Sequence, residues 1–285
     1  MQTQNKLKKS LKTQDWHMQK RGNLTLLHSP LLSAHRDKGF VHAFTTRDGG
    51  STPAPYHNFN LGRHIKDEDL KQDALANREL LCRELGVNHQ MLRVPGQVHS
   101  GNVLVVKDNE EHDLAGVDGL VTDNSGLPLL LHFADCVPVM IFETDKRLVG
   151  IVHAGWRGTA QSIAVNAVNL MVEKWGANPS AMVAAVGPAI GPCCYPTGND
   201  VVERLMATVS DKGVAGDWQE LVQVGADGQP HPNLKAINAL QLLACGVAEV
   251  DVCSFCTACR PDLFFSHRQS GGVTGRQGAL ACLSK

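Results

Sequence analysis

The sequence lacks the features that would assign it to a membrane, a nucleic-acid-binding or a secreted protein. No apolar run approaches the roughly 20 residues that span a bilayer. The formal net charge of −1 gives no electrostatic reason to expect binding to nucleic acid or to a membrane surface. Segment 1–22 contains no apolar signal-peptide core, so we expect the nine cysteines to be reduced thiols in the cytoplasm.

What the sequence does contain is an alternation of strand and helix patterns, which indicates an α/β fold. Segment 1–22 is predicted to be a polar, solvated or poorly ordered tail, and residues 23–285 a single domain, because no linker or repeat divides them. Since consecutive strands lack long helices between them, antiparallel or mixed pairing is favoured. Helices are expected over residues 67–85, 159–175, 199–209 and 233–245, and strands over 102–107, 119–122, 127–133, 137–143, 148–153, 181–186 and 249–253.

The stretch 151–159, IVHAGWRGT, places polar side chains at the end of a buried strand. Its two glycines allow a tight turn, and Thr159 is expected to cap the helix that follows. His153 and Arg157 would then lie near a helix N-terminus, where anions are favoured. A structural strand-turn-helix junction with a hydrogen-bonded His is the alternative, and this segment alone does not choose between them.

Other apolar segments also end in reactive side chains. A fold that brings these strand ends together would gather two His and one Cys, the ligand chemistry of a catalytic zinc site with three protein ligands and one open position. Thirteen His and nine Cys allow several such triplets, and no spacing rule chooses among them. The strand-end residues are Gln97 and His99, Asp135 and Cys136, His153, and the segments 263–268 and 275–278 near the C-terminus.

A series of short motifs extends in order from about Phe40 to the C-terminus. In chain order they are Gln97-Val-His99, Gly116-Val-Asp118-Gly119, Ala134-Asp-Cys136, His153-Ala-Gly-Trp-Arg-Gly158, Gly187-Pro-Ala-Ile-Gly191, Cys256-Thr257, Phe265-Ser-His-Arg268 and Gly275-Arg276. This order closely resembles the YfiH family, whose members are also called peptidoglycan editing factors or, in older usage, multicopper polyphenol oxidases (laccases). The resemblance implies a single-domain mixed α/β sandwich of the YfiH type, in which strand-end loops build a catalytic site.

Joined to this resemblance, the strand-end pattern assigns a metal site to His99, Cys136 and His153. Neutral imidazoles and a thiolate suit zinc, which we expect, and also copper. A bound divalent ion would keep Cys136 deprotonated and lower the pKa of a bound water toward about 7, which provides a nucleophile at neutral pH. The alternative for both histidines is a satisfied place in the core.

Three further residues are predicted to be catalytic beside the metal, namely Gln97, Asp135 and Arg157. Asp135 is expected either to support Cys136 from behind or to serve as a strand-end turn residue. Gln97 is expected either to orient substrate or to pair with backbone. Arg157 lies in a specific family motif, and its guanidinium offers the bidentate geometry that suits phosphate, with a structural ion pair as the alternative.

Substrate binding is assigned to Arg47, Asn60 and Arg268. Arg268 has the same chemistry and the same alternative as Arg157. Arg47, in the glycine-rich turn 45–50, and Asn60 both resemble the family's N-terminal motifs, where an anion or a sugar hydroxyl could bind. An ordinary loop explains the two equally well.

The cysteines at 253, 256 and 259 form a C-x-x-C-x-x-C pattern, whose role the sequence leaves open. The bacterial ferredoxin pattern needs a fourth Cys three residues later, and this chain has none there. Of the three, only Cys256 matches the family's Cys-Thr pair. Cys193 and Cys194 are expected to lie in a packed turn. The family often follows the next residue, Tyr195, with Glu, whereas here Pro196 follows, so no role for that Glu is carried over.

Three functions compete. The resemblance favours a zinc-dependent purine nucleoside phosphorylase that also deaminates adenosine, with adenosine, inosine, guanosine and methylthioadenosine as candidate substrates beside phosphate. An amidohydrolase that edits a peptidoglycan precursor would use similar zinc chemistry. Copper-dependent polyphenol oxidation would need many paired His, and the sequence contains no His-x-His pair. The sequence gives no oligomeric state.

Overall fold

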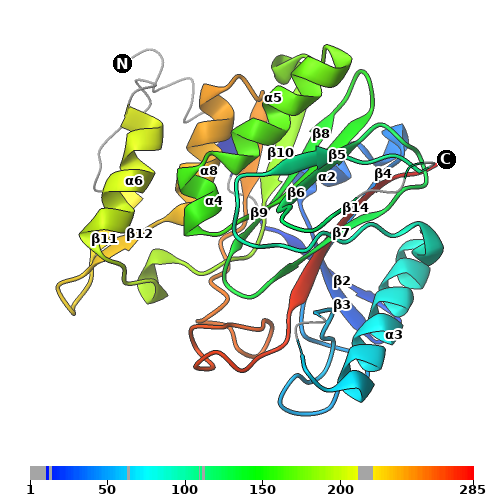
Figure 1. The fold of residues 1–285 in the computed structure, drawn as a ribbon, viewed down its shortest axis with the longest axis horizontal. Coiled ribbons are helices and arrows are strands. Elements are labelled where there is room, and N and C mark those ends of the chain that lie inside the picture. The colour runs from blue at the N-terminus through cyan, green and yellow to red at the C-terminus, as the bar shows by residue number, and fades with distance from the viewer. Residues whose placement is uncertain (1–10, 13–14, 63–64, 109, 111–112, 211–220) are drawn as a thin grey trace.

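The computed structural model describes residues 11–12, 15–62, 65–108, 110, 113–210 and 221–285. Two β-sheets pack against each other, and helices cover their outer faces (Figure 1). This is the single-domain mixed α/β sandwich that the sequence predicts. No helix in the described part of the chain combines the length and the apolar character that are needed to cross a bilayer.

The larger sheet is mixed, as the short connections between its strands predict. Its central strands β10, β8, β9 and β6 pair antiparallel, and parallel strands flank them on both sides. In spatial order the seven strands are β1 (Leu11–Lys12), β13 (Glu249–Val252), β10 (Met182–Val186), β8 (Val137–Glu143), β9 (Leu148–Ala154), β6 (Gly119–Thr122) and β5 (Val103–Val105).

The smaller sheet is antiparallel throughout. In spatial order its five strands are β2 (His17–Arg21), β3 (Leu24–His28), β4 (Phe40–Thr45), β14 (Gln277–Leu283) and β7 (Leu129–Phe133). A separate two-stranded ribbon joins β11 (Val222–Val224) to β12 (Pro230–Pro232).

Alternation along the strands separates two faces of the larger sheet. In β8, Met140 and Phe142 point into the core between the sheets, whereas Val139 and Ile141 pack under the helices. This period of two is what a strand buried on both faces requires. The result is a four-layer arrangement with helices outside and sheets inside (Figure 1).

The helices divide between the two outer faces. Helices α5, α6 and α8 cover the larger sheet, and α3 covers the smaller one (Figure 1). Of two short helices, α2 lies in the connection between β3 and β4, and α4 lies between β9 and α5. The helix bounds are α2 Pro30–Ser33, α3 Glu68–Leu85, α4 Trp156–Ala160, α5 Ile163–Trp175, α6 Asn199–Ser210 and α8 Leu234–Ala244.

Several helix ends follow the sequence signals. The Asp67 side chain accepts hydrogen bonds from two backbone N–H groups and so caps α3, which ends at Gly86 with a left-handed φ of 69°. Asn233 caps α8 through the N–H of Ala236. The prediction that Thr159 caps one long helix is wrong, because that segment forms two helices and Thr159 lies inside the first, buried against Asn238.

The predicted tail 1–22 also differs from the structure where the structure describes it. Residues His17–Arg21 form the mostly exposed edge strand β2, paired with β3. Trp16 is buried, and its Nε1 donates to Asp251 Oδ1 over 3.1 Å. A single buried aromatic therefore anchors a polar segment. Residues 1–10 and 13–14 lie outside the described residues.

Strand ends meet at one end of the sandwich. Val137 pairs with Ala154, Val152 with Gly119, and Gln277 with Phe133. These registers bring together the β7–β8 turn, the start of β6, the end of β9 and the start of β14. The motifs that the sequence analysis singled out are concentrated in the loops at this end.

Candidate metal centre and cleft

A cleft of about 1080 Å³ opens at this end of the sandwich. Its wall combines residues from the long loop before β5, the β7–β8 turn, the β9–α4 junction and the C-terminal loops. The cleft is lined by three potential metal ligands, by three arginines and by other polar side chains. These are His99, Cys136 and His153, then Arg157, Arg268 and Arg276, and finally Gln97, Asp135 and Tyr195.

The structure brings the three predicted ligands together. Cys136 directly precedes β8, and His153 lies opposite Pro138 in the β8–β9 ladder, so the pairing places their side chains side by side. The loop that carries His99 brings its ring to a centroid distance of 4.9 Å from the ring of His153. The candidate ligand atoms of the three residues all lie within 4.8 Å of one another. Strand pairing thus brings Cys136 and His153 together, and the loop before β5 adds His99.

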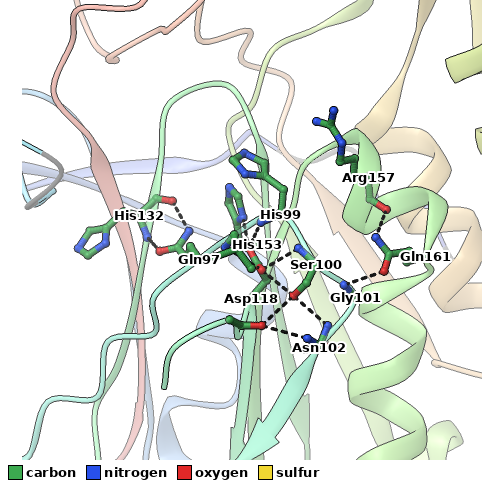
Figure 2. Close-up of polar contacts among 12 residues, drawn as sticks. Gln97, His99, Ser100, Gly101, Asn102, Asp118, His132, His153, Arg157 and Gln161 are labelled. Carbon is green, nitrogen blue, oxygen red and sulfur yellow. Dashed lines mark hydrogen bonds and ion pairs between the residues drawn. The ribbon is translucent and has the colours of Figure 1, made fainter. Parts of the chain in front are cut away.

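Asp118 fixes the orientation of His153 (Figure 2). Its Oδ1 lies 2.8 Å from His153 Nδ1, and its side chain is fully buried. With Nδ1 donating to the carboxylate, Nε2 is the nitrogen that is available to a metal. A carboxylate behind a histidine in this way sets the tautomer and increases the basicity of the ligating nitrogen.

The same carboxylate holds the loop of His99. Asp118 accepts hydrogen bonds from the backbone N–H groups of Val98, His99 and Ser100 at 2.8 to 3.0 Å. Burial opposes the charge, but the hydrogen bonds from His153, Ser100 and Val98 outweigh it and hold the pKa of Asp118 well below its usual range. One buried carboxylate therefore positions two of the three candidate ligands.

Backbone conformation at the site is unusual. Gln97, His99 and Asp135 have φ values of 38°, 64° and 84°, in the left-handed region that side chains with a Cβ rarely adopt. Each such residue costs about 1 to 3 kcal/mol and persists where surrounding contacts hold it. In Gln97 those contacts are visible, because its amide donates to His132 O and accepts from His132 N, both over 2.8 Å (Figure 2).

Of the two roles predicted for Gln97, these contacts support the second, in which its side-chain amide hydrogen-bonds to backbone groups. The pairing ties the loop before β5 to strand β7 and keeps His99 in place. The ring of His132 points away from His99 and His153 (Figure 2). Gln97 still lines the cleft, but both ends of its amide are engaged with the backbone.

Charge in the cleft favours a thiolate. Burial raises the pKa of Cys136, but the nearby His153 and His99 outweigh it and lower that pKa to about 6. Burial likewise opposes protonation of His153, yet the Cys136 thiolate and Asp118 raise its pKa to about 9. Without a metal, the two side chains therefore form a thiolate–imidazolium pair at neutral pH. A cation that replaces the imidazolium proton would find both ligands in the form that binds metal.

The space around the three side chains also suits an ion. A Cβ at position 155 would come within 2.9 Å of the His99 ring and 3.0 Å of the Cys136 sulfur, so only glycine allows this close approach. His153 is buried, Cys136 half-buried and His99 exposed. One side of the group thus faces the cleft. Two imidazoles and a thiolate with one free side could hold a single ion such as zinc or copper and leave one position open.

Asp135 links the loops behind Cys136. Its Oδ1 accepts from the Thr257 hydroxyl over 2.6 Å, and its Oδ2 accepts from the backbone N–H of Arg268 over 2.7 Å. Its carbonyl oxygen accepts from Ile190 N–H. Of the two predicted roles, these contacts support a strand-end residue that positions its neighbours, because both carboxylate oxygens are engaged.

Arginines contribute positive charge to the cleft wall. The exposed Arg157 is the second residue of α4, and its guanidinium stacks on Trp156 at 4.5 Å from the ring centroid. Arg268 lies over the Tyr195 ring at 5.1 Å. Arg276 is half-buried, and its Nη1 donates to the carbonyls of Thr274 and Gly275. Within the described part of the chain, neither Arg157 nor Arg268 forms an ion pair with a carboxylate.

Arg47 and Asn60 lie outside the residues that line the cleft. The Arg47 guanidinium donates to the carbonyls of Pro261 and His57 and stacks on the Phe265 ring. Asn60 is fully buried, and its Oδ1 accepts from the backbone N–H of Arg276 over 2.8 Å. Their described contacts hold loops together, and substrate binding by either stays a prediction.

Three residues of the site, Asp118, Tyr195 and Arg276, are not predicted from the sequence. Asp118 and Arg276 lie in family motifs, but nothing in the sequence says that one carboxylate reaches two loops or that Arg276 lines the cleft. Tyr195 has no local signal that predicts a place in the site. Burial, and then the Cys136 thiolate, raise the pKa of Tyr195 to about 12, so the phenol keeps its proton at neutral pH.

The fold and site define a class: mixed α/β sandwiches with an open His/Cys group in a cationic cleft. A family model described as multi-copper polyphenol oxidoreductase laccase matches residues 41–284, and the chain belongs to this family. A solved structure titled Bacillus licheniformis hypothetical protein YfiH is similar with a TM-score of 0.82 and 30% identity, covering 94% of this chain and 99% of that one. The predicted relation to YfiH is therefore confirmed.

Two curated relatives have names that refer to purine nucleosides. The purine nucleoside phosphorylase YlmD of Geobacillus stearothermophilus is 40% identical over 252 residues, which cover 85% of this chain and 89% of the relative. The adenosine deaminase RL5 of an unknown prokaryotic organism is 34% identical, covering 83% of this chain and 91% of the relative. The family thus contains proteins with two nucleoside activities and a family name that refers to copper.

Proposed function

We propose that this protein is a zinc-dependent purine nucleoside phosphorylase that also deaminates adenosine. The observation that carries the proposal is the open His99–Cys136–His153 group in a cleft that arginines also line. The names of the relatives support the nucleoside substrates, with adenosine, inosine, guanosine and methylthioadenosine as candidates. A cytoplasmic location agrees with the nine free cysteines.

The arginines would bind the phosphate. Phosphorolysis needs a dianion held beside the ribose C1′ while a phosphate oxygen forms a bond to that carbon and the glycosidic bond to the base breaks. Arg157 and Arg268 have exposed guanidinium groups on the cleft wall, stacked on Trp156 and Tyr195. Stacking restricts a guanidinium without using its N–H donors. Arg268 Nη1 makes a long hydrogen bond of 3.4 Å to the carbonyl of Pro196, and its other nitrogens can still make a bidentate contact with phosphate.

The residues around the ligands would position the metal and the purine. Asp118 holds His153 and the His99 loop, and Asp135 holds the segment that carries Arg268. Tyr195, with its proton retained, offers a hydrogen-bond donor on the cleft wall. Zinc, when bound by the two imidazoles and the thiolate, supplies Lewis-acid activation of water for the replacement of the adenosine amino group.

Zinc fits this donor set better than the copper of an oxidase. Among the described residues, the cleft group consists of two His and one Cys, and the other His/Cys group consists of cysteines alone. A trinuclear copper cluster needs several paired His. The imidazole and thiolate ligands of the cleft suit one borderline-soft ion with an open position.

The proposal is tested by incubating the purified protein with inosine or adenosine, with and without phosphate and without added copper. The expected products are hypoxanthine and ribose 1-phosphate from inosine with phosphate, and inosine from adenosine. Inactivity on nucleosides with cleavage of a peptidoglycan-precursor amide at the same site would favour the editing amidohydrolase instead. Oxidation of phenols by the protein as purified would favour the oxidase.

A further inference from the structure

A second group of metal-binding side chains lies outside the cleft. Cys193 and Cys194 belong to the one-turn helix Pro192–Cys194, and Cys256 and Cys259 to the loop after β13. Their sulfur atoms all lie within 4.8 Å of one another, with Cys259 at 3.3 Å from Cys194 and 3.5 Å from Cys193. Two segments more than 60 residues apart thus converge on one point with four sulfurs.

We propose that Cys193, Cys194, Cys256 and Cys259 form a closed structural zinc site. Four thiolates around one ion are a standard donor set for structural zinc, which needs no open position. This site is separate from the metal group of the cleft and does not depend on the proposed function.

The geometry matches a single tetrahedral ion. A Zn–S distance of about 2.3 Å places the sulfurs of a tetrahedron about 3.8 Å apart. The sulfur–sulfur distances here, from 3.3 Å to within 4.8 Å, bracket that value. An iron–sulfur cluster places several iron atoms between its cysteine ligands and needs a wider set of sulfurs. The spacing therefore favours one ion.

Gly191 leaves the space for the group. Its backbone N–H donates to the Cys256 sulfur over 3.2 Å, a contact that stabilises negative charge on sulfur. A Cβ at this position would come within 3.2 Å of the Cys193 sulfur and 3.6 Å of the Cys256 sulfur. Both the donor and the missing side chain suit a ligated thiolate.

A buried cation, Lys235, lies close enough to Cys256 and Cys193 to interact with them electrostatically. The Lys235 side chain is 6% exposed, and its Nζ donates to the carbonyls of Cys253 and Phe255 at 2.7 and 2.8 Å. A buried ammonium is costly unless negative charge lies nearby, and the two carbonyls contribute only dipoles. Four thiolates on a divalent ion carry a net charge of −2. Such a group would compensate the charge of Lys235, which four neutral thiols would not.

The site would fasten the wall of the cleft. Cys194 directly precedes Tyr195, and Cys256 directly precedes Thr257, whose hydroxyl binds Asp135. The backbones of the two segments also meet in an isolated bridge between Ala189 and Cys256 and in a hydrogen bond from Thr257 N to Ala189 O. A zinc ion would join these loops where regular secondary structure does not.

Zinc stoichiometry tests the proposal. Protein purified under reducing conditions without added metal is analysed for zinc and iron as wild type and as Cys259→Ala, Cys136→Ala and Cys253→Ala. Cys253 is the matched control, since it belongs to the same C-x-x-C-x-x-C pattern but packs in the core and not in the group. We expect Cys259→Ala to hold one zinc fewer than wild type and Cys253→Ala to match it.

Cys136→Ala separates this proposal from the proposed function. If both sites hold zinc, the double variant Cys136→Ala/Cys259→Ala holds none and each single variant holds one. Loss of zinc in Cys259→Ala alone would leave this proposal standing while the cleft assignment fails. Unchanged zinc content in Cys259→Ala, or iron in place of zinc, would overturn this proposal.

A measurement on wild type avoids any folding defect of the variants. Native protein is treated with a thiol-alkylating reagent before and after a strong chelator, and the labelled cysteines are mapped by mass spectrometry. We expect the exposed Cys193 and Cys259 to resist labelling until zinc is removed. Immediate labelling of both, or a disulfide that joins Cys259 to Cys193 or Cys194, would contradict the zinc site.

Discussion

Among the described residues, one group of two His and one Cys and a second group of four Cys lie close enough to bind a metal, and they differ in ways that match two different tasks. The cleft group has three donors, with His153 buried and His99 exposed on the side of the cleft. The group of Cys193, Cys194, Cys256 and Cys259 has four donors, all sulfur, behind the cleft wall. Three ligands with an open side suit catalysis, and four ligands that complete a tetrahedron suit structure.

The backbone distinguishes the two groups as well. Gln97, His99 and Asp135 in and beside the cleft group have left-handed φ values, whereas none of the four cysteines of the other group does among the described residues. Strain of this kind is typical of sites where a side chain must point in one direction for function. The cysteine group needs only that two turns lie close together. Proximity of His and Cys side chains therefore does not by itself define a catalytic centre.

The largest effect is expected from removing a ligand of the cleft group. Cys136→Ala and His153→Ala should lose the cleft zinc, because only two of its three protein ligands would remain. Activity on inosine should then fall to background. Zinc content and hypoxanthine release are measured together. Cys253→Ala, a buried cysteine outside both groups, is the control and should retain activity. Full activity in Cys136→Ala would place the chemistry elsewhere.

A smaller loss of zinc affinity or activity is expected from changing Asp118, which hydrogen-bonds to His153 and to the loop of His99. Asp118→Asn should weaken zinc binding or activity by about 10- to 100-fold, because an amide cannot serve all five of the donors that reach this carboxylate. Competition with a chelator measures the zinc affinity. Asp123→Asn removes a carboxylate that binds Trp175 outside the cleft and should change neither quantity. If Asp118→Asn and Asp123→Asn had the same zinc affinity and the same activity, Asp118 would not position the ligands.

A still smaller effect on activity is expected when an arginine that would bind phosphate is removed. Arg157→Ala should raise the phosphate KM or lower kcat/KM by roughly tenfold, since a charge-assisted contact is worth about 1.5 to 3 kcal/mol. Arg260→Ala is the control, because Arg260 also stacks on an aromatic ring but pairs with Asp262 outside the cleft. An unchanged phosphate dependence in Arg157→Ala would make this arginine structural.

No effect on activity is expected from a buried histidine outside both groups, whose contribution is to stability alone. Burial lowers the pKa of His42 to about 3, so folded His42 stays neutral while the unfolded side chain binds a proton below about pH 6.5. Its contribution to the free energy of unfolding is therefore present above pH 6.5 and falls by up to about 1.4 kcal/mol per pH unit below it. Urea unfolding at several pH values should give a flatter acid slope for His42→Gln than for wild type or the exposed-site control His17→Gln.

The sequence predicted the central strands because apolar runs with period two leave a local signal. The three candidate ligands follow strand ends, but strand ends alone allow several His/Cys triplets, and the resemblance to the YfiH family is what selected His99, Cys136 and His153. Strand pairing, which brings Pro138 opposite His153, then completes the group. The prediction of mixed pairing was correct for the same reason, since short connections cannot form parallel crossovers.

What the sequence could not provide was contact between distant loops. The sequence left the role of the pattern at 253, 256 and 259 open. In the structure Cys253 packs into the core between the sheets, while the turn directs Cys256 and Cys259 toward Cys193 and Cys194. The reach of Asp118 to two loops depends on burial in the same way. Contacts of this kind have no spacing rule and appear only in three dimensions.

The most direct test of the account is a zinc titration of the cleft. Wild-type protein stripped of metal receives increasing zinc, and hypoxanthine release from inosine in the presence of phosphate is measured at each step beside His153→Ala. The account predicts that activity rises with zinc occupancy in wild type and stays at background in the variant. Equal activity of metal-free and zinc-loaded wild type, or zinc-restored activity in His153→Ala, would contradict it.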